Sequence, residues 1–244
     1  MFHNMKSPKE AVDGSAAKVM TSPNAAGAGR PCAERRGSMN ILEGKRAFVT
    51  GAGRGIGRAI AAKLAEAGAE VAIADIDAAN ADAAAAAIPN ATAYALDVSN
   101  RAEVVKAVDA FAGKGGLDIM VANAVYFHYA PLVDMPEDIV GRMLDVGLKG
   151  TYWAVAAATP HLARRGGGSI ITLSSIAVSF AIKNAAVYTS IKGAIDALTR
   201  QQAIELAPAN IRVNAIAPGT VVTPGASSVI DPEGWEKRRA MAPL

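Results

Sequence analysis

Short apolar segments alternate with helical stretches from residue 46 to residue 217, and this alternation restricts the possible folds more than any other feature of the chain. Each apolar segment is bounded by Gly or by charged residues, as buried strands usually are. Strands that alternate with helices pair in parallel through right-handed crossovers. The pattern therefore predicts an α/β domain with a doubly wound parallel sheet. The predicted strands occupy residues 46–50, 70–75, 91–96, 117–122, 168–174 and 210–217.

The segments between these strands carry helical periodicity. Between the first two strands, Ile60, Leu64 and Ala67 recur at helical spacing, and Gly68 is typical of a helix end. Residues 101–112 and 136–164 are predicted to be helical as well. No sequence repeat of the solenoid type is present.

The chain is predicted to consist of one domain preceded by an extension. Residues 1–38 are rich in Ala, Gly, Ser, Pro and charge and show no apolar periodicity, which predicts a disordered and dispensable N-terminal extension. Residues 39–244 form the predicted dinucleotide-binding domain, and Met39 opens a strand–turn–helix unit. An upstream translation start or a transit peptide would also account for the extension, although its acidic residues disfavour the latter.

Charge and composition exclude several classes of function. Six of the 25 Lys and Arg residues and three of the 22 Asp and Glu residues precede Met39, so the remainder carries no net charge and no nucleic acid partner is expected. No apolar run approaches the roughly 20 residues of a membrane span, so no membrane partner is expected either. With one cysteine and three scattered histidines, neither a disulfide nor a metal site is predicted. We expect a cytoplasmic protein.

A Gly-rich turn, "TGAGRGIG" at 50–57, lies where the first strand ends and a helix begins. Glycines at this place permit a tight turn and let backbone N–H groups approach a phosphate at the helix N-terminus. The spacing of Gly51, Gly55 and Gly57 departs from G-x-G-x-x-G, so the turn is a variant of that fingerprint. By itself the turn is equally compatible with an ordinary strand–helix connection.

Asp75 ends the second strand about 20 residues beyond the turn. An acidic side chain there can accept hydrogen bonds from a ribose 2′-hydroxyl and would repel a 2′-phosphate. The next residue is Ile76 rather than a basic one, which favours NAD as cofactor. Arg54 in the turn could bind a phosphate, so NADP is the alternative. A solvated Asp at a strand end is the other interpretation of Asp75.

Tyr188 and Lys192 are four residues apart in a predicted helix and therefore lie on one face of it. A neighbouring ammonium is expected to lower the pKa of the phenol toward a value useful in acid–base catalysis. Ser175 ends the strand run "SIITLSS" at 169–175, at the sheet edge where such folds place their sites. A Tyr and a Lys at this spacing are common by chance, but their combination with the Gly turn and Ser175 favours a catalytic group.

In combination these segments resemble the short-chain dehydrogenase/reductase family, and the resemblance extends from about residue 45 to residue 223. The motifs that carry it are the Gly turn, "LDVS" at 96–99, "ANA" at 122–124, Ser175, "YTSIK" at 188–192 and "NAIAPGTVVT" at 214–223. The resemblance implies a Rossmann-like sheet with strand order 3-2-1-4-5-6. It also implies a homo-oligomer, weakened here because the chain lacks the family's usual seventh strand.

The resemblance also implies roles for individual residues. Tyr188 would transfer the proton, Ser175 would hold the substrate oxygen, and Lys192 would bind the nicotinamide ribose and tune Tyr188. Asp97 and Val98 would contact adenine. The full set of implied cofactor-binding residues is Gly51, Arg54, Gly55, Ile56, Gly57, Asp75, Asp97, Val98, Asn123, Ala124, Tyr188, Lys192, Pro218, Gly219, Val221 and Thr223.

Two residues depart from the family pattern within the predicted site. Val125 stands where the family usually has a glycine beside the cofactor, and Gly147 replaces an Asn that organises a water next to the lysine. We expect Gly147→Asn to raise the catalytic rate and to add modest stability, because Gly is unfavourable within a helix.

The predicted function is that of an NAD(P)-dependent oxidoreductase that interconverts a secondary alcohol and a ketone. A catalytically impaired relative that only binds dinucleotide is the alternative, because of Gly147 and the short C-terminus. The sequence does not identify the substrate. Tyr126, Phe127, His128 and Trp153 are candidates for aromatic or amphipathic walls of its pocket.

Overall fold

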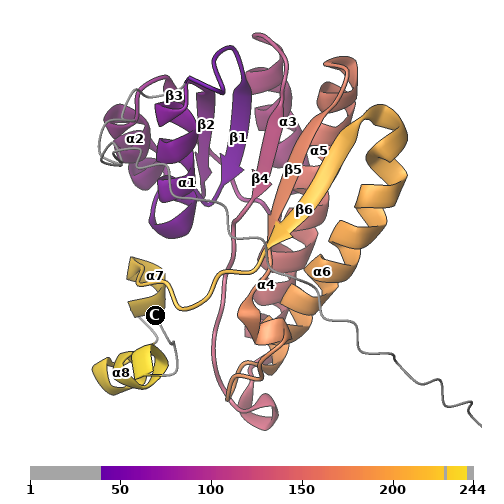
Figure 1. Cartoon of the computed structure of the whole chain (residues 1–244). Helices are drawn as coiled ribbons and strands as arrows, with labels where there is room; N and C mark the ends of the chain where they lie inside the picture. The colour runs from indigo at the N-terminus through magenta and orange to yellow at the C-terminus, as the bar shows by residue number, and fades with distance from the viewer. Residues whose placement is uncertain (1–39, 228–229, 241–244) are drawn as a thin grey trace, which may run out of the picture. The chain divides into compact units, whose positions relative to one another are not determined.

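A computed structural model describes residues 40–227 and 230–240 and contains one six-stranded sheet (Figure 1). Every neighbouring pair of strands is parallel, and the order is β3-β2-β1-β4-β5-β6. The predicted doubly wound fold and strand order are therefore confirmed. The strands are β1 (Arg46–Thr50), β2 (Glu70–Asp75), β3 (Ala91–Ala95), β4 (Ile119–Ala122), β5 (Gly168–Leu173) and β6 (Ile211–Ile216).

Helices connect successive strands and cover the sheet (Figure 1). They are α1 (Gly55–Glu66), α2 (Ala78–Ala87), α3 (Arg101–Ala112), α4 (Glu137–Leu144), α5 (Gly150–Arg164), α6 (Ala186–Leu206), α7 (Pro224–Ser227) and α8 (Pro232–Ala240). The predicted helix at 136–164 is divided, because a π-helical segment at Asp145–Lys149 separates α4 from α5. In a π-helical segment the backbone hydrogen bonds span five residues rather than the four of an α-helix.

The apolar runs of the central strands supply both faces of the sheet. Successive side chains of a strand point to opposite faces. In β1, Phe48 accordingly joins the cluster that packs under α3 and α5, whereas Ala47 and Val49 join the cluster under α1 and α2. Burial on both faces explains why these strands are continuously apolar rather than alternating.

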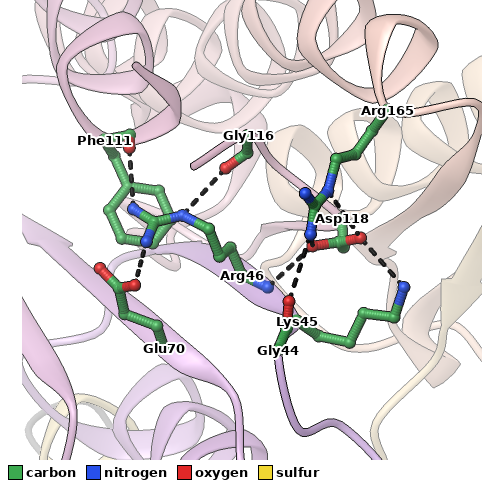
Figure 2. A network of polar contacts seen from close by, with 8 residues as sticks. All are labelled: Gly44, Lys45, Arg46, Glu70, Phe111, Gly116, Asp118 and Arg165. Carbon is green, nitrogen blue, oxygen red and sulfur yellow. Dashed lines mark hydrogen bonds and ion pairs between the residues drawn. The ribbon is translucent and has the colours of Figure 1, made fainter. Parts of the chain in front are cut away.

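A buried arginine joins elements at the edge of the sheet where the strands begin (Figure 2). The guanidinium of Arg46 lies 4.2 Å from the ring centroid of Phe111 and donates hydrogen bonds to the carbonyls of Phe111 (2.8 Å) and Gly116 (3.0 Å). It also pairs with Glu70 at the start of β2. Arg46 thereby connects β1 with β2 and with the end of α3.

Asp118 occupies the neighbouring position in the same network (Figure 2). Its carboxylate accepts hydrogen bonds from the backbone N–H of Arg46 (3.0 Å), the ammonium of Lys45 (3.1 Å) and the guanidinium of Arg165 (3.2 Å). Burial alone would raise the pKa of Asp118, but these hydrogen bonds outweigh it and lower the pKa below its usual value. The carboxylate therefore stays ionised and connects β1, β4 and the end of α5.

Two further observations concern the periphery of the fold. β6 lies at an edge of the sheet and, within residues 40–227 and 230–240, pairs with β5 alone. None of the helices described is both long and apolar enough to cross a membrane. The predicted extension at 1–38 lies outside the described residues and stays a prediction.

Candidate active site

A cavity of about 390 Å³ lies where the loops that follow the strands meet. Because all six strands are parallel, their carboxyl ends share one edge of the sheet, which is where open α/β folds bind ligands. The structure places every predicted site residue on the wall of this cavity. They are Gly51, Arg54, Gly55, Ile56, Gly57, Asp75, Asp97, Val98, Asn123, Ala124, Ser175, Tyr188, Lys192, Pro218, Gly219, Val221 and Thr223.

The Gly turn brings the N-terminus of α1 against the end of β1. Gly51 and Gly55 have φ angles of +62° and +60°, which L side chains rarely adopt. A Cβ atom on Gly57 would lie only 2.2 Å from the carbonyl oxygen of Gly51, so the close approach requires glycine there. Arg54 precedes α1 without capping it through its side chain, which leaves the N–H groups of the first turn available to an anion.

Asp75 is fixed against this turn. One of its carboxylate oxygens accepts a hydrogen bond from the N–H of Gly53 at 2.9 Å, and the other accepts one from the N–H of Asp77 at 3.1 Å. A Cβ atom on Gly53 would lie 2.9 Å from the carboxylate, so the absence of a side chain allows the contact. Since each carboxylate oxygen can accept a further bond, Asp75 can still receive ligand hydroxyls.

Asn123, which directly follows β4, is hydrogen-bonded to the Gly turn. Its side-chain amide donates to the carbonyls of Thr50 (2.9 Å) and Gly51 (3.0 Å). In return, the hydroxyl of Thr50 accepts the backbone N–H groups of Asn123 and Ala124. Asn123 therefore lines the cavity as expected, but its side-chain amide donates both of these hydrogen bonds to the protein backbone.

Asp97 is joined to α4 by an ion pair that was not foreseen from the sequence. Its carboxylate accepts the N–H and hydroxyl of Ser99 and, at 3.0 Å, the guanidinium of Arg142. Burial alone would raise the pKa of Asp97, but the hydrogen bonds from Ser99 and Arg142 outweigh it and lower the pKa. Arg142 also lines the cavity. It lies 45 residues from Asp97 in the chain, and no motif marked it.

Ser175, Tyr188 and Lys192 come together from two elements. Ser175 follows β5, and its hydroxyl accepts the N–H of Ala177 at 3.1 Å. Tyr188 lies in the first turn of α6, and Lys192 lies one turn further along. The ammonium of Lys192 is 5.8 Å from the ring centroid of Tyr188 and donates to the carbonyl of Leu173 at 2.5 Å.

Burial controls the pKa values of this group. Burial raises the pKa of Tyr188 above 10.0, and a hydrogen bond with Ser175 offsets only part of the increase. Burial lowers the pKa of Lys192 to about 8, with Asp196 acting in the opposite direction. The predicted lowering of the Tyr188 pKa by Lys192 is therefore wrong for this structure. Lys192 is directed to Leu173, and desolvation of the phenolate dominates.

Aromatic and aliphatic side chains form the cavity wall around Tyr188. The rings of Phe127 and Tyr129 lie edge-on to the ring of Tyr188, with centroids 6.1 and 5.7 Å away. Three further large apolar residues on the cavity wall were not predicted and come from segments distant in sequence, so the sequence pattern offered little to find them. They are Ile182, Ile230 and Trp235.

The suggested aromatic walls are only partly correct. Tyr126 and Phe127 line the cavity as expected. Trp153 does not, because on α5 it packs against the core and its ring lies 5.1 Å from the guanidinium of Arg101. His128 is exposed and is also absent from the cavity wall. Among the described residues, no group of three or more His, Cys, Asp or Glu could hold a metal ion.

Comparisons with known proteins give a consistent picture. A family model described as enoyl-(acyl carrier protein) reductase matches residues 51–244. Galactitol 2-dehydrogenase of Agrobacterium fabrum is 42% identical over 200 residues, which cover 80% of this chain and 74% of that protein. Sorbitol dehydrogenase of Cereibacter sphaeroides is 38% identical over 198 residues, with the same two coverages.

Two solved structures that resemble this chain are likewise a dehydrogenase and a reductase, each in complex with NADH. A 7α-hydroxysteroid dehydrogenase in complex with NADH and 7-oxo glycochenodeoxycholic acid superposes with a TM-score of 0.78 at 36% identity, covering 82% of this chain and 80% of that chain. The 3-ketoacyl-(acyl-carrier-protein) reductase from Brucella melitensis in complex with NADH has a TM-score of 0.78 at 33% identity, covering 83% and 84%.

Proposed function

Because the chain belongs to the short-chain dehydrogenase/reductase family and is an NAD(P)-dependent oxidoreductase that interconverts a secondary alcohol and a ketone, we propose that Ser175, Tyr188 and Lys192 carry the proton transfer of that reaction. The supporting observation is that all three line one cavity with the Gly turn. Nothing in the comparisons supports the alternative of a catalytically impaired relative.

The residues of the cavity fit a nicotinamide dinucleotide. The Gly turn presents bare backbone beside a helix N-terminus without a side-chain cap, which suits a diphosphate. Asp75 stands where ribose hydroxyls would be received. The hydroxyl of Ser174 is buried on the cavity wall without a partner in the described structure, and a bound ligand could satisfy it. When bound, the nicotinamide group supplies or accepts the hydride.

The proton transfer follows from the chemistry of the three side chains. In the direction of ketone reduction, the Tyr188 hydroxyl donates its proton to the developing alkoxide oxygen, while the Ser175 hydroxyl holds that oxygen by a hydrogen bond. In the reverse direction the Tyr188 phenolate accepts the proton of the alcohol. The raised pKa of Tyr188 keeps the phenol protonated near neutral pH, which suits donation. Lys192 can stabilise the phenolate when its ammonium turns from Leu173 toward the ring.

Tyr188→Phe tests this assignment. The substitution removes the transferable proton but keeps the ring that packs against Phe127 and Tyr129. We expect turnover to fall at least about 100-fold, the lower range for loss of a general acid, while NADH affinity stays unchanged. Tyr152→Phe, on the exposed side of α5, is the matched control. Near-native turnover of Tyr188→Phe on any accepted ketone would rule out Tyr188 as the proton donor.

We further propose that NAD is preferred over NADP. Asp75 supports this proposal, because its carboxylate is held on the cavity wall by Gly53 and Asp77 and would repel a 2′-phosphate. Asp75→Asn keeps an acceptor for Gly53 and removes the charge, so the ratio of NADPH to NADH affinity should rise. Asp77→Asn is the control, since an Asn can still cap α2. A native protein that binds NADPH as tightly as NADH in fluorescence titrations would contradict the preference.

The family resemblance also leads us to propose a cytoplasmic homo-oligomer. Exposed apolar side chains such as Val133 (92%) and Phe180 (70%) are compatible with contacts between copies. Light scattering of the purified full chain tests the assembly, and a purely monomeric mass would contradict it. Cell fractionation tests the location, and recovery with membranes would contradict a cytoplasmic protein.

A further inference from the structure

The cavity wall carries five charged side chains, and the structure accounts for each of them. Its charged side chains are Arg54, Asp75, Asp97, Arg142 and Lys192. The first two belong to the Gly turn and the end of β2, and Asp97 and Arg142 neutralise each other at 3.0 Å. Lys192 is buried beneath Tyr188 and bonded to the backbone. Each of these charges is therefore paired, bonded to the backbone or, for Arg54, part of the Gly turn that fits the dinucleotide.

Six aromatic or aliphatic side chains also line the cavity, and two of them, Phe127 and Tyr129, pack against the ring of Tyr188. We call this group of six the apolar arm, and it comes from three segments: the loop after β4, the loop before α6 and the region from residue 230 onward. They are Tyr126, Phe127, Tyr129, Ile182, Ile230 and Trp235. Their only polar atoms are the phenol hydroxyls of Tyr126 and Tyr129 and the indole N–H of Trp235.

Trp235 shows that the apolar arm is not formed by loops alone. It lies in α8, which is otherwise rich in charge, with Glu233 and Lys237 exposed and paired with each other. Trp235 alone among these three side chains is buried, at 7% exposure, and it faces the cavity. A polar helix thus contributes one large apolar side chain, and it places that side chain on the cavity wall.

This wall is poorly suited to a polyol. Each hydroxyl of a polyol that enters the cavity loses its bonds to water and needs a new partner, and a site that leaves it unpaired binds it weakly. The apolar arm provides few partners, whereas its aromatic faces and aliphatic side chains match the C–H surface of a ring system. Two of these rings, Phe127 and Tyr129, contact the ring of Tyr188 itself.

We propose that the substrate is an apolar alicyclic or aromatic ketone, or the matching secondary alcohol, without charge or adjacent hydroxyl groups near the reacting carbon. The proposal rests on the proposed function of Tyr188. It differs from what the polyol dehydrogenases among the relatives would suggest, since galactitol and sorbitol carry a hydroxyl on every carbon.

The test compares two ketones with the full chain and NADH. trans-1-Decalone represents the apolar ring class, and L-erythrulose represents the polyhydroxy ketones without forming a stable ring. We expect kcat/KM for trans-1-decalone to exceed that for L-erythrulose at least 100-fold. Equal or faster reduction of L-erythrulose would overturn the substrate class and leave the proposed function standing.

A binding measurement separates the two proposals. The sequence contains two tryptophans, so Trp153→Phe leaves Trp235 as the sole indole reporter. With NADH bound, we expect trans-1-decalone to change the fluorescence of Trp235 and L-erythrulose to leave it unchanged at equal concentration. Binding of trans-1-decalone without turnover would support the substrate class and contradict the proposed function. No effect of trans-1-decalone on either fluorescence or NADH oxidation would overturn the substrate class.

Two variants test whether the apolar arm is responsible for the preference for trans-1-decalone over L-erythrulose. Ile230→Asn and Ile182→Asn each add an amide to one side of the arm, and they lie on separate segments, so loosening of α8 cannot explain both. We expect each to lower kcat/KM for trans-1-decalone about 10-fold or more with an unchanged KM for NADH. Ile204→Asn, on the exposed face of α6, is the matched control. If both variants keep the native ratio between the two ketones, the apolar arm does not select the substrate.

Discussion

At the scale of single residues, the most unusual group is the buried ammonium of Lys192. Its side chain is almost fully enclosed, with 4% of the residue exposed, and it donates to the carbonyl of Leu173. Removing an ammonium from water disfavours the charged form, which is why its pKa falls from 10.5 to about 8. The cost is compatible with a functional position, because catalytic sites commonly hold groups with shifted pKa values.

The lowered pKa of Lys192 predicts that the stability of the folded state depends on pH. Between pH 8 and pH 10.5 the unfolded chain still holds a proton on Lys192, whereas the folded chain has released it. Raising the pH through this window therefore favours the folded state. We expect the melting temperature of the native protein, relative to that of Lys192→Met, to rise from about pH 8 to pH 10.5.

The comparison is best made against a second lysine. Lys63→Met, which removes an exposed ammonium of α1 instead of a buried one, is the matched control. Differential scanning fluorimetry at half-unit pH steps is sufficient. A constant difference between the native protein and Lys192→Met would show that Lys192 has an ordinary pKa in the folded protein.

At the scale of elements, the π-helical segment at Asp145–Lys149 changes what was expected of Gly147. Gly147 does not face open space, because a Cβ atom there would lie 3.0 Å from the Cγ2 methyl of Ile191 in α6. Overpacking typically costs about 1–3 kcal/mol, more than the helix propensity gained by replacing Gly. The stability gain predicted for Gly147→Asn is therefore replaced by an expected loss.

A double variant separates packing from catalysis. Ile191→Leu removes the Cγ2 methyl that an Asn at position 147 would meet. We expect Gly147→Asn alone to lower the melting temperature by a few degrees, and the combination with Ile191→Leu to recover most of that loss, as neighbouring sites couple. Turnover of the combination should exceed that of Ile191→Leu alone. Recovered stability without any gain in turnover, at every pH measured, would refute the role assigned to an Asn at this position.

At the scale of the whole molecule, stability and catalysis are placed at opposite edges of the sheet. The Asp118 network (Figure 2) lies where the strands begin. The cavity lies where the strands end. In parallel sheets of this kind the two edges are separated by the length of the strands. Substitutions in the network should therefore affect folding without affecting the reaction.

Asp118→Asn tests this separation. Loss of charged hydrogen bonds from Lys45 and Arg165 should cost about 2 kcal/mol, or about 4–8 °C in melting temperature for a domain of this size. Because the folded pKa of Asp118 lies below 3.8, this stabilisation should be present above pH 3.8 and be lost as the pH falls further. Asp82→Asn, on the exposed face of α2, is the control. An unchanged melting temperature, or a changed KM for NADH, would contradict the prediction.

The sequence by itself determined the strands, their parallel pairing and the edge that carries the cavity, whereas the strand order was implied by the family resemblance. These follow from local information, since apolar segments specify strands and intervening helices require parallel neighbours. Once the strands are parallel, every residue that follows a strand is brought to the same edge. For this reason Gly51, Asp75, Asn123 and Ser175, which are far apart in the chain, were all placed on one cavity wall without knowledge of any contact.

Only the tertiary structure decided the electrostatics and the lining of that cavity. The direction of the Tyr188 pKa depends on burial and on where the Lys192 ammonium points, and neither is a property of residue spacing. Arg142 and Trp235 reach the cavity through helices whose sequences carry no site motif, whereas Trp153 is turned toward α3. Such outcomes depend on the packing of elements distant in the chain, because desolvation and side-chain direction are set by all neighbours at once rather than by the local sequence.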